Sequence, residues 1–170
     1  MKLIITGACG HIGSYVAENI HKVKKIKKTI LIDNLKSNRF CSIFNQNKKN
    51  NLEFHLGDLT DEKSLDKFKK ANYLIHCASM TNAEKSFGKE KEMYKNNLDC
   101  LKTVINFCNK NKVKLIHLSS TSVYGKQVAL VDETCEKKYL KPQSPYAKIK
   151  LIEERMLKKE KKLDYITFRF

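Results

Sequence analysis

The chain has 170 residues, a length typical of one globular domain that can enclose a hydrophobic core. It contains no apolar run of the roughly 18 residues that a membrane-spanning helix requires. Its 34 basic and 18 acidic residues give a formal net charge of +16, which raises the question of nucleic-acid binding. Because the lysines are spread along the sequence, with few aromatic residues between them and no RNA- or DNA-binding motif, we interpret this charge as a general property of the surface.

The first predicted element is a buried strand at residues 2–6, which leads directly into the turn Gly-Ala-Cys-Gly-His-Ile-Gly. A helix is predicted near residues 12–24. Glycine allows a sharp turn and a close backbone approach, and the free N–H groups and positive end of a new helix favour a pyrophosphate. The glycines are Gly7, Gly10 and Gly13, so their spacing is GxxGxxG and not the GxGxxG of the standard dinucleotide fingerprint. Three glycines in so short a stretch could also form only a tight turn.

The second predicted strand covers residues 29–33 and ends in Asp33. An acidic residue about twenty positions after a glycine turn accepts hydrogen bonds from the adenosine ribose in dinucleotide-binding folds. A carboxylate there would repel a 2′-phosphate, which favours NAD over NADP. The alternative is that Asp33 is only a solvated residue at the end of its strand.

The rest of the chain alternates between strands and helices. Further strands are predicted at residues 52–56, 72–76, 113–118 and 164–170. Helices are predicted at residues 38–45, 61–70, 91–109 and 144–161, and residues 122–142 are predicted to be mainly loop. Repeated βα units indicate an α/β fold with a doubly wound, Rossmann-like parallel sheet of about six strands. Within the helix at 91–109, Asn97 is a polar residue near an apolar stripe; it could satisfy backbone groups or help to place a loop near a cofactor.

A hydroxyl-rich segment follows the strand at 113–118, in the order Ser119-Ser120-Thr121-Ser122. The carboxyl ends of parallel strands carry the ligand site in such sheets, although serine and threonine also simply end strands. Further along, Tyr146 and Lys150 are four residues apart and therefore share one face of a helix. A neighbouring ammonium, together with the positive nicotinamide ring, is expected to lower the pKa of the tyrosine and make it a usable acid or base. A YxxxK pair alone is weak because lysine-rich helices often contain it, but the order of glycine turn, Asp33, serine cluster and YxxxK is a strong signal.

In this order of motifs the chain resembles the N-terminal part of extended short-chain dehydrogenases/reductases, the NAD-dependent epimerase/dehydratase family. The similar stretches are TGACGHIGS, LIDNLKSN, GDLTD, IHCAS, NNL, SSTSVYG and SPYAKIK. The forms of LIDNLKSN and SSTSVYG are most similar to those of UDP-glucose 4-epimerases and their close relatives.

The resemblance implies a set of NAD-binding and catalytic residues. The cofactor-binding residues would be Gly7, Gly10, His11, Ile12, Gly13, Asp33, Asn34, Leu35, Lys36, Ser37, Asn38, Asp58, Leu59, Cys77, Ala78, Ser79, Asn97, Tyr146 and Lys150. The first five would lie at the pyrophosphate, the next six at the adenosine ribose, and Asp58 and Leu59 at the adenine. Ser120, Tyr146 and Lys150 would be the catalytic residues.

Two departures from the family are visible. The 4,6-dehydratases have an Asp-Glu pair after the catalytic hydroxyl residue, where this chain has Thr121-Ser122, so simple dehydration is disfavoured. The family also continues for well over a hundred residues beyond the equivalent of Phe170 with a substrate domain, so residues 1–170 are expected to be an NAD-binding domain that lacks it. The expected activity is nucleotide-sugar 4-epimerisation; a dehydratase, reductase or decarboxylase of the same family and a non-catalytic NAD-binding module remain alternatives.

The remaining expectations concern partners and location. The resemblance implies a homodimer formed through the helices near 91–109 and 145–161, a nucleotide-sugar substrate, and no nucleic-acid partner. The six cysteines form no CxxC pair and no Cys/His metal spacing, so no metal is expected and the thiols are predicted to be reduced. Because the first strand begins at the N-terminus, leaving no room for a signal peptide, we expect a cytoplasmic protein.

Overall fold

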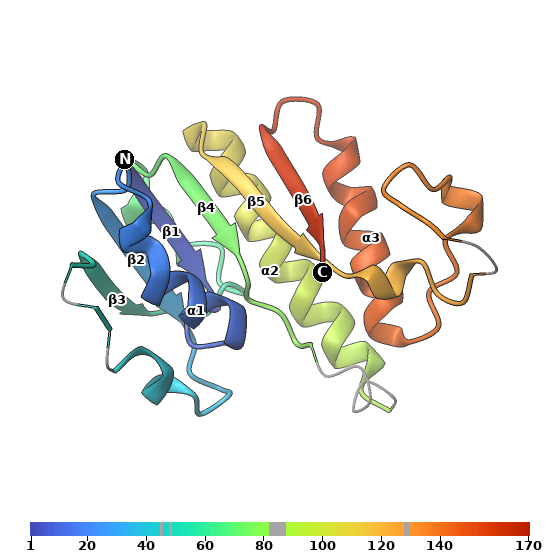
Figure 1. The fold of residues 1–170 in the computed structure, drawn as a ribbon, viewed down its shortest axis with the longest axis horizontal. Helices are drawn as coiled ribbons and strands as arrows, with labels where there is room; N and C mark the ends of the chain where they lie inside the picture. Colours follow the sequence, from blue (N-terminus) through green and yellow to red (C-terminus); the bar gives the residue numbers. More distant parts are fainter. Residues whose placement is uncertain (45, 48, 82–87, 128–129) are drawn as a thin grey trace.

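The computed structural model describes residues 1–44, 46–47, 49–81, 88–127 and 130–170 (Figure 1). Its strands are β1 (Lys2–Thr6), β2 (Lys28–Asp33), β3 (Leu52–Leu56), β4 (Tyr73–His76), β5 (Lys114–Ser119) and β6 (Tyr165–Arg169). Its α-helices are α1 (His11–Asn19), α2 (Glu90–Asn111) and α3 (Pro145–Lys159). Short 3₁₀ helices are η1 (Ile20–Lys22), η2 (Phe40–Ile43), η3 (Asp66–Phe68), η5 (Thr121–Val123) and η6 (Lys137–Tyr139).

The six strands form one parallel sheet in the order β3-β2-β1-β4-β5-β6. The chain first moves outward from β1 to β3 and then returns to the other side of β1, so the strand order reverses between β1 and β4 (Figure 1). Thr6 is the register partner of both Ile32 and His76 at this point. The predicted doubly wound fold is therefore confirmed, and such a reversal is where open parallel sheets bind nucleotides.

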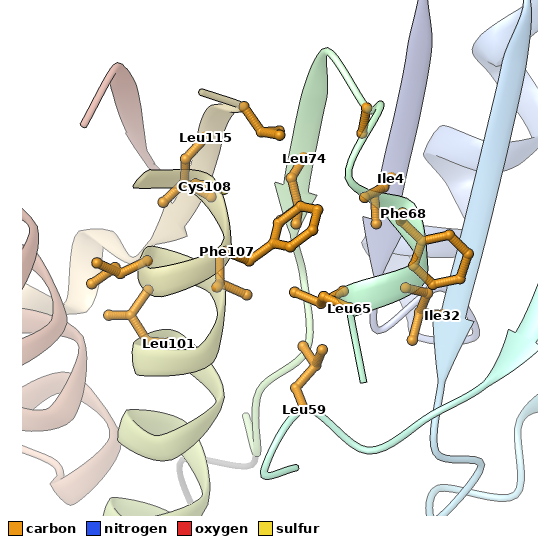
Figure 2. Close-up of a cluster of buried hydrophobic side chains, with 14 of the residues drawn as sticks. Ile4, Ile32, Leu59, Leu65, Phe68, Leu74, Leu101, Phe107, Cys108 and Leu115 are labelled. Atoms are coloured by element: carbon orange, nitrogen blue, oxygen red, sulfur yellow. The ribbon is translucent and has the colours of Figure 1, made fainter. Parts of the chain in front are cut away.

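Helices cover both faces of the sheet because the buried strands are apolar on both sides. On one face, Ile4, Leu74 and Leu115 pack with Leu101 and Phe107 of α2 in the main hydrophobic cluster (Figure 2). Alternate residues of β1 and β2, such as Leu3, Ile5 and Leu31, pack on the other face with Ala17 and Ile20. The central strands β1 and β2 are thus enclosed, which fixes the position of the loops that follow them.

Helix α3 begins at a well-defined cap. The Ser144 side chain accepts a hydrogen bond from the Ala147 N–H at 3.1 Å, and Pro145 occupies the first turn, where its missing N–H costs nothing. The helix spans Pro145–Lys159, within the predicted range 144–161. This start sets the rotation of α3 and thereby the direction in which Tyr146 and Lys150 point.

The prediction of an α-helix over residues 61–70 is wrong. This segment is a series of turns that ends in the short helix η3. The side chains of Asp58 and Asp61 accept hydrogen bonds from the backbone N–H groups of Thr60 and Lys63, at 3.0 Å in both cases. Aspartate carboxylates that bind the backbone two residues ahead favour turns over a continuous helix.

Two other predicted helices are shorter or tighter than expected. The helix predicted at 12–24 ends as an α-helix at Asn19 and continues only as η1. The helix predicted at 38–45 is the 3₁₀ helix η2, and Asn45 itself lies outside the described residues, as do positions 128 and 129 of the predicted loop 122–142. No helix in the described part of the chain is long and apolar enough to cross a membrane.

Candidate active site

The glycine turn between β1 and α1 is so tightly packed that Gly7 and Gly13 cannot be replaced by residues with a Cβ without a clash. Gly7 has a positive φ of 65°, and a Cβ there would lie 2.5 Å from the backbone nitrogen of Ala78. A Cβ on Gly13 would lie 2.3 Å from the Gly7 carbonyl oxygen. The exposed residues His11 and Ile12 form the first turn of α1, and Gly10, which precedes it, provides no side-chain cap. The turn therefore fits a pyrophosphate, because it leaves backbone N–H groups and the positive helix end open to an anion.

Asp33 lies at the carboxyl end of β2 and is buried. Its two carboxylate oxygens accept hydrogen bonds from the backbone N–H groups of Cys9, at 3.0 Å, and Leu35, at 2.8 Å. The carboxylate thus fixes the glycine turn to the loop after β2. A carboxylate offers about four acceptor positions, so two remain for ribose hydroxyls.

The predicted ribose-binding segment 34–38 is a turn-rich loop beside the end of β3. Leu35 and Asn38 have positive φ values of 59° and 55°. The Lys36 ammonium lies 2.8 Å from a carboxylate oxygen of Asp58. Burial opposes ionisation of Asp58, but the hydrogen bonds from Lys36 and Thr60 outweigh it and hold its pKa below the usual range.

Three further predicted cofactor residues follow β4. Cys77, Ala78 and Ser79 form the loop next to the glycine turn, and the Cys77 N–H donates to the Thr6 carbonyl at 3.0 Å. Asn97, fully buried on α2, accepts a hydrogen bond from the Met80 N–H at 2.8 Å and donates one to the Met80 carbonyl at 3.1 Å. Asn97 therefore satisfies two backbone groups and fixes the segment that follows the loop after β4.

One predicted residue has other surroundings than expected. The Leu59 side chain is buried in the main core cluster, so only its backbone could contact an adenine (Figure 2). The Cys9 thiol, within the glycine turn, is also buried, and burial raises its pKa to about 11. All six cysteines are free, and the described residues contain no group of three side chains suited to a metal.

Ser120 follows β5 and caps the short helix η5. Its hydroxyl accepts a hydrogen bond from the Ser122 N–H at 3.2 Å and lies 2.7 Å from the Ser122 hydroxyl. Helix η5 packs against α3. A cavity of about 330 Å³ lies at this junction and is lined by Thr121, Ser122, Gly125, Gln143, Ser144 and Ala147. Side chains of η5 and of the start of α3 thus surround this space, and Ser120 and Tyr146 are sequence neighbours of its lining residues.

Tyr146 and Lys150 lie on the buried side of α3. Tyr146 packs against a small cluster that includes Met80, one residue beyond the loop after β4. The Lys150 side chain is only 5% exposed, and its ammonium lies 5.9 Å from the centre of the Tyr146 ring. The predicted pair is therefore brought together, and it lies beside the strand-end loops.

The Lys150 ammonium alone does not lower the pKa of the Tyr146 hydroxyl in this structure. Burial raises the pKa of the Tyr146 hydroxyl to about 12, and the negative charge of Glu153 acts in the same direction. Burial is the larger cause. The Lys150 ammonium, which could oppose it, lies 2.7 Å from a carboxylate oxygen of Glu153, and this pairing leaves the Tyr146 hydroxyl without a net stabilising charge.

Sequence reasoning also missed the buried groups around this pair. The same Glu153 oxygen lies 3.0 Å from Nε2 of His117, and both side chains are almost fully buried. One signal was present, because Lys150 lies among apolar residues of α3, where a lysine requires a counter-charge, and Glu153 is three positions away.

A second ion pair joins α3 to the last strand. Arg169 forms two hydrogen bonds with Glu154, at 2.9 and 2.7 Å, and Glu154 also accepts one from the Ser119 hydroxyl at 2.6 Å. The Arg169 guanidinium lies 4.9 Å from the centre of the Tyr124 ring. This contact fixes the segment around Ser120 between β6 and α3.

Replacing Arg169 with methionine is therefore expected to lower the free energy of unfolding by about 2 kcal/mol, because it leaves the largely buried Glu154 carboxylate without its cation. The change is measured by urea denaturation. Lys114→Met is the control: it breaks the exposed pair with Asp164, which also joins β5 to the start of β6, and should leave the midpoint nearly unchanged. Equal effects of the two substitutions would contradict this role of Arg169.

Comparison with known proteins agrees with this arrangement. A model of the NAD dependent epimerase/dehydratase family matches residues 3–170. The chain is 29% identical over 163 residues to dTDP-D-glucose 4,6-dehydratase of Dictyostelium discoideum, covering 86% of this chain and 37% of that protein. It is 29% identical over 162 residues to UDP-glucose 4-epimerase of the same organism, covering 92% of this chain and 46% of that protein.

Among solved structures, UDP-N-acetylglucosamine 4-epimerase from Methanobrevibacter ruminantium M1 is similar, with a TM-score of 0.84 and 30% identity. The match covers 99% of this chain and 54% of that one. The chain thus spans about half of the length of these epimerases, and the matched half contains the glycine turn and the Tyr146–Lys150 pair. The chain belongs to the NAD dependent epimerase/dehydratase family.

Proposed function

We propose that residues 1–170 form the NAD-binding domain of a nucleotide-sugar epimerase. One observation carries the proposal: all the groups that such a reaction needs lie at one edge of the sheet. The glycine turn and Ser120 follow β1 and β5, and Asp33 ends β2. Tyr146 packs against the same buried cluster as Met80, which follows the loop after β4.

The residues that would hold NAD extend from the glycine turn to the loop after β4. The N–H groups at the start of α1 would bind the diphosphate, and Asp33 would bind the adenosine ribose with its remaining lone pairs. Asp58 would lie at the adenine, next to Lys36, and the backbone of residues 77–79 would border the nicotinamide half. The nicotinamide of bound NAD would supply the acceptor of a hydride and, on return, its donor.

Tyr146, Lys150 and Ser120 would handle the proton. Tyr146, as the phenolate, would take the proton from a ring hydroxyl of the sugar and later give it back. Ser120 would donate a hydrogen bond to the reacting oxygen. Lys150 would stabilise the phenolate and bind the nicotinamide ribose. The cavity between η5 and the start of α3, lined by Ser122 and Ser144, would accommodate the sugar end of the substrate.

The residues after Ser120 support an epimerase over a dehydratase. Removal of water from the sugar needs an additional acid and base, and the next two residues, Thr121 and Ser122, carry only hydroxyls. The Thr121 hydroxyl donates to the Phe170 carbonyl at 3.0 Å, and the Ser122 hydroxyl pairs with Ser120. Neither side chain ionises at ordinary pH.

Calorimetric titration of the purified chain with NAD and NADP, followed by incubation with a panel of nucleotide hexoses, tests the proposal. We expect tighter binding of NAD than of NADP, because the Asp33 carboxylate would repel a 2′-phosphate. We also expect interconversion of two sugar epimers, measured by chromatography of the products. A well-folded sample that takes up no NAD would contradict the proposal, and NAD binding without turnover of any sugar would favour a non-catalytic module instead.

A further inference from the structure

A row of polar side chains crosses four strands of the sheet beneath α3. Thr6, His76, His117 and Thr167 are register partners on β1, β4, β5 and β6. We call these four residues the polar row. The Thr6 hydroxyl lies 2.9 Å from Nδ1 of His76, and the Thr167 hydroxyl lies 3.4 Å from Nδ1 of His117. The two imidazole rings are nearly parallel, with centres 6.5 Å apart.

The polar row is connected to α3 through one carboxylate oxygen. Oε2 of Glu153 lies 3.0 Å from Nε2 of His117 and 2.7 Å from the Lys150 ammonium. A carboxylate only accepts, so His117 must donate its Nε2–H and use Nδ1 as the acceptor for Thr167. Glu153 therefore fixes the tautomer of His117, and the hydrogen bond from Nε2–H orients the Glu153 carboxylate.

The charges in this buried group are few. Burial lowers the pKa of His76 to about 3 and also lowers that of His117, so both rings are neutral at ordinary pH. Burial pushes the pKa of Glu153 upward, but the charge of Lys150 and the hydrogen bond from His117 outweigh this and hold it below the usual range. Glu153 and Lys150 therefore form one buried ion pair, and these two charges are the ones that face Tyr146.

We propose that Glu153, oriented by His117, is a positioning residue: it holds the Lys150 ammonium and reduces the stabilisation that this ammonium gives to the Tyr146 phenolate. The inference rests on the proposed function, since Tyr146 is the group whose ionisation matters there. If the Lys150 ammonium moved away from Glu153 toward the cofactor, it would stabilise the Tyr146 phenolate more strongly, and Tyr146 would ionise more readily. Glu153 would thus set the pH range in which the proton transfer operates.

The test is an ultraviolet titration of tyrosinate in the absence of NAD and sugar. The chain has seven tyrosines, so the signal of Tyr146 is obtained by subtracting the curve of the same protein with Tyr146→Phe. Glu153→Gln leaves the Lys150 cation without its opposing charge and is expected to move the Tyr146 midpoint to lower pH by about one unit. Glu153→Asp keeps the charge and should move it much less.

The control is Glu154→Gln, which removes the neighbouring carboxylate of the same helix but faces Arg169 and Ser119 instead. It should leave the Tyr146 midpoint unchanged. An unchanged midpoint in Glu153→Gln, or an equal shift in Glu154→Gln, overturns the proposal. Because the titration needs neither NAD nor substrate, its result is independent of whether the proposed function holds.

Removing one partner of a buried pair can prevent folding, so a second comparison is included. The double variant Lys150→Met/Glu153→Gln buries no unpaired charge. Because the proposal acts through the Lys150 ammonium, Glu153→Gln should lower the Tyr146 midpoint only where Lys150 is present, so the double variant should titrate Tyr146 no lower than the unaltered protein. A Tyr146 midpoint about one unit lower in the double variant would also overturn the proposal.

Discussion

Replacing Tyr146 with phenylalanine is expected to reduce sugar epimerisation by at least about 100-fold and to leave NAD affinity nearly unchanged. The substitution removes only the hydroxyl that would exchange the proton, and the ring keeps its packing against the cluster that includes Met80. Turnover is measured by chromatography of the epimeric sugars, and affinity by calorimetry.

Tyr73→Phe is the matched control for this change. Tyr73 is the first residue of β4 and therefore lies at the opposite end of the sheet from the strand-end loops. Loss of its hydroxyl should change neither turnover nor NAD affinity. Unchanged turnover in Tyr146→Phe, or equal losses in both variants, would refute the catalytic role of Tyr146.

Gly13→Ala is expected to weaken NAD binding by at least about 100-fold and to destabilise the fold by about 2 kcal/mol. A Cβ at this position would lie 2.3 Å from the Gly7 carbonyl oxygen and 2.8 Å from Cα of Ala8, and both neighbours are backbone atoms that cannot rotate away. The turn would have to open, which would separate the N–H groups that are proposed to bind the diphosphate. Calorimetric titration with NAD and thermal unfolding measure the two effects.

Two further variants serve as comparisons for Gly13→Ala: one is a control, and one should have an intermediate effect. Glu18→Ala changes an exposed residue of the same helix and should affect neither quantity. Gly10→Ala should have a smaller effect on stability, because its Cβ would meet only the Gly7 carbonyl oxygen, at 3.2 Å. Full NAD affinity in Gly13→Ala would show that this turn does not hold the diphosphate.

Most of the fold follows from signals that are local in the sequence. The apolar runs at residues 2–6 and 29–33, the glycine spacing between them and the helical stripe at 91–109 predict β1, β2 and α2 closely. The segment 61–70 shows where such signals fail. Its acidic start and basic end are typical of a helix, but Asp58 and Asp61 use the same carboxylates to bind their own backbone, which stabilises turns.

The candidate site was predictable only in part, for a different physical reason. Helical spacing brings Tyr146 and Lys150 to one face, and the structure bears this out. Burial and the charge of Glu153 both raise the Tyr146 pKa, and the orientation of Glu153 depends on His117, which is 36 positions earlier in the chain. The contact between Glu153 and His117 is set by the packing of α3 on β5, so residue spacing within the helix could not indicate it.

Strand β1 pairs with both β2 and β4, so the sheet can be completed only after β4 has been synthesised. The pairing of β1 with β4 joins positions 70 residues apart, as in the contact between Thr6 and His76. Non-local pairing of this kind slows folding. A nascent chain that has released only β1 to β3 from the ribosome carries one open edge of β1, and such an edge can recruit other chains. We expect this interval to be the period in which aggregation competes with folding and a chaperone is most useful.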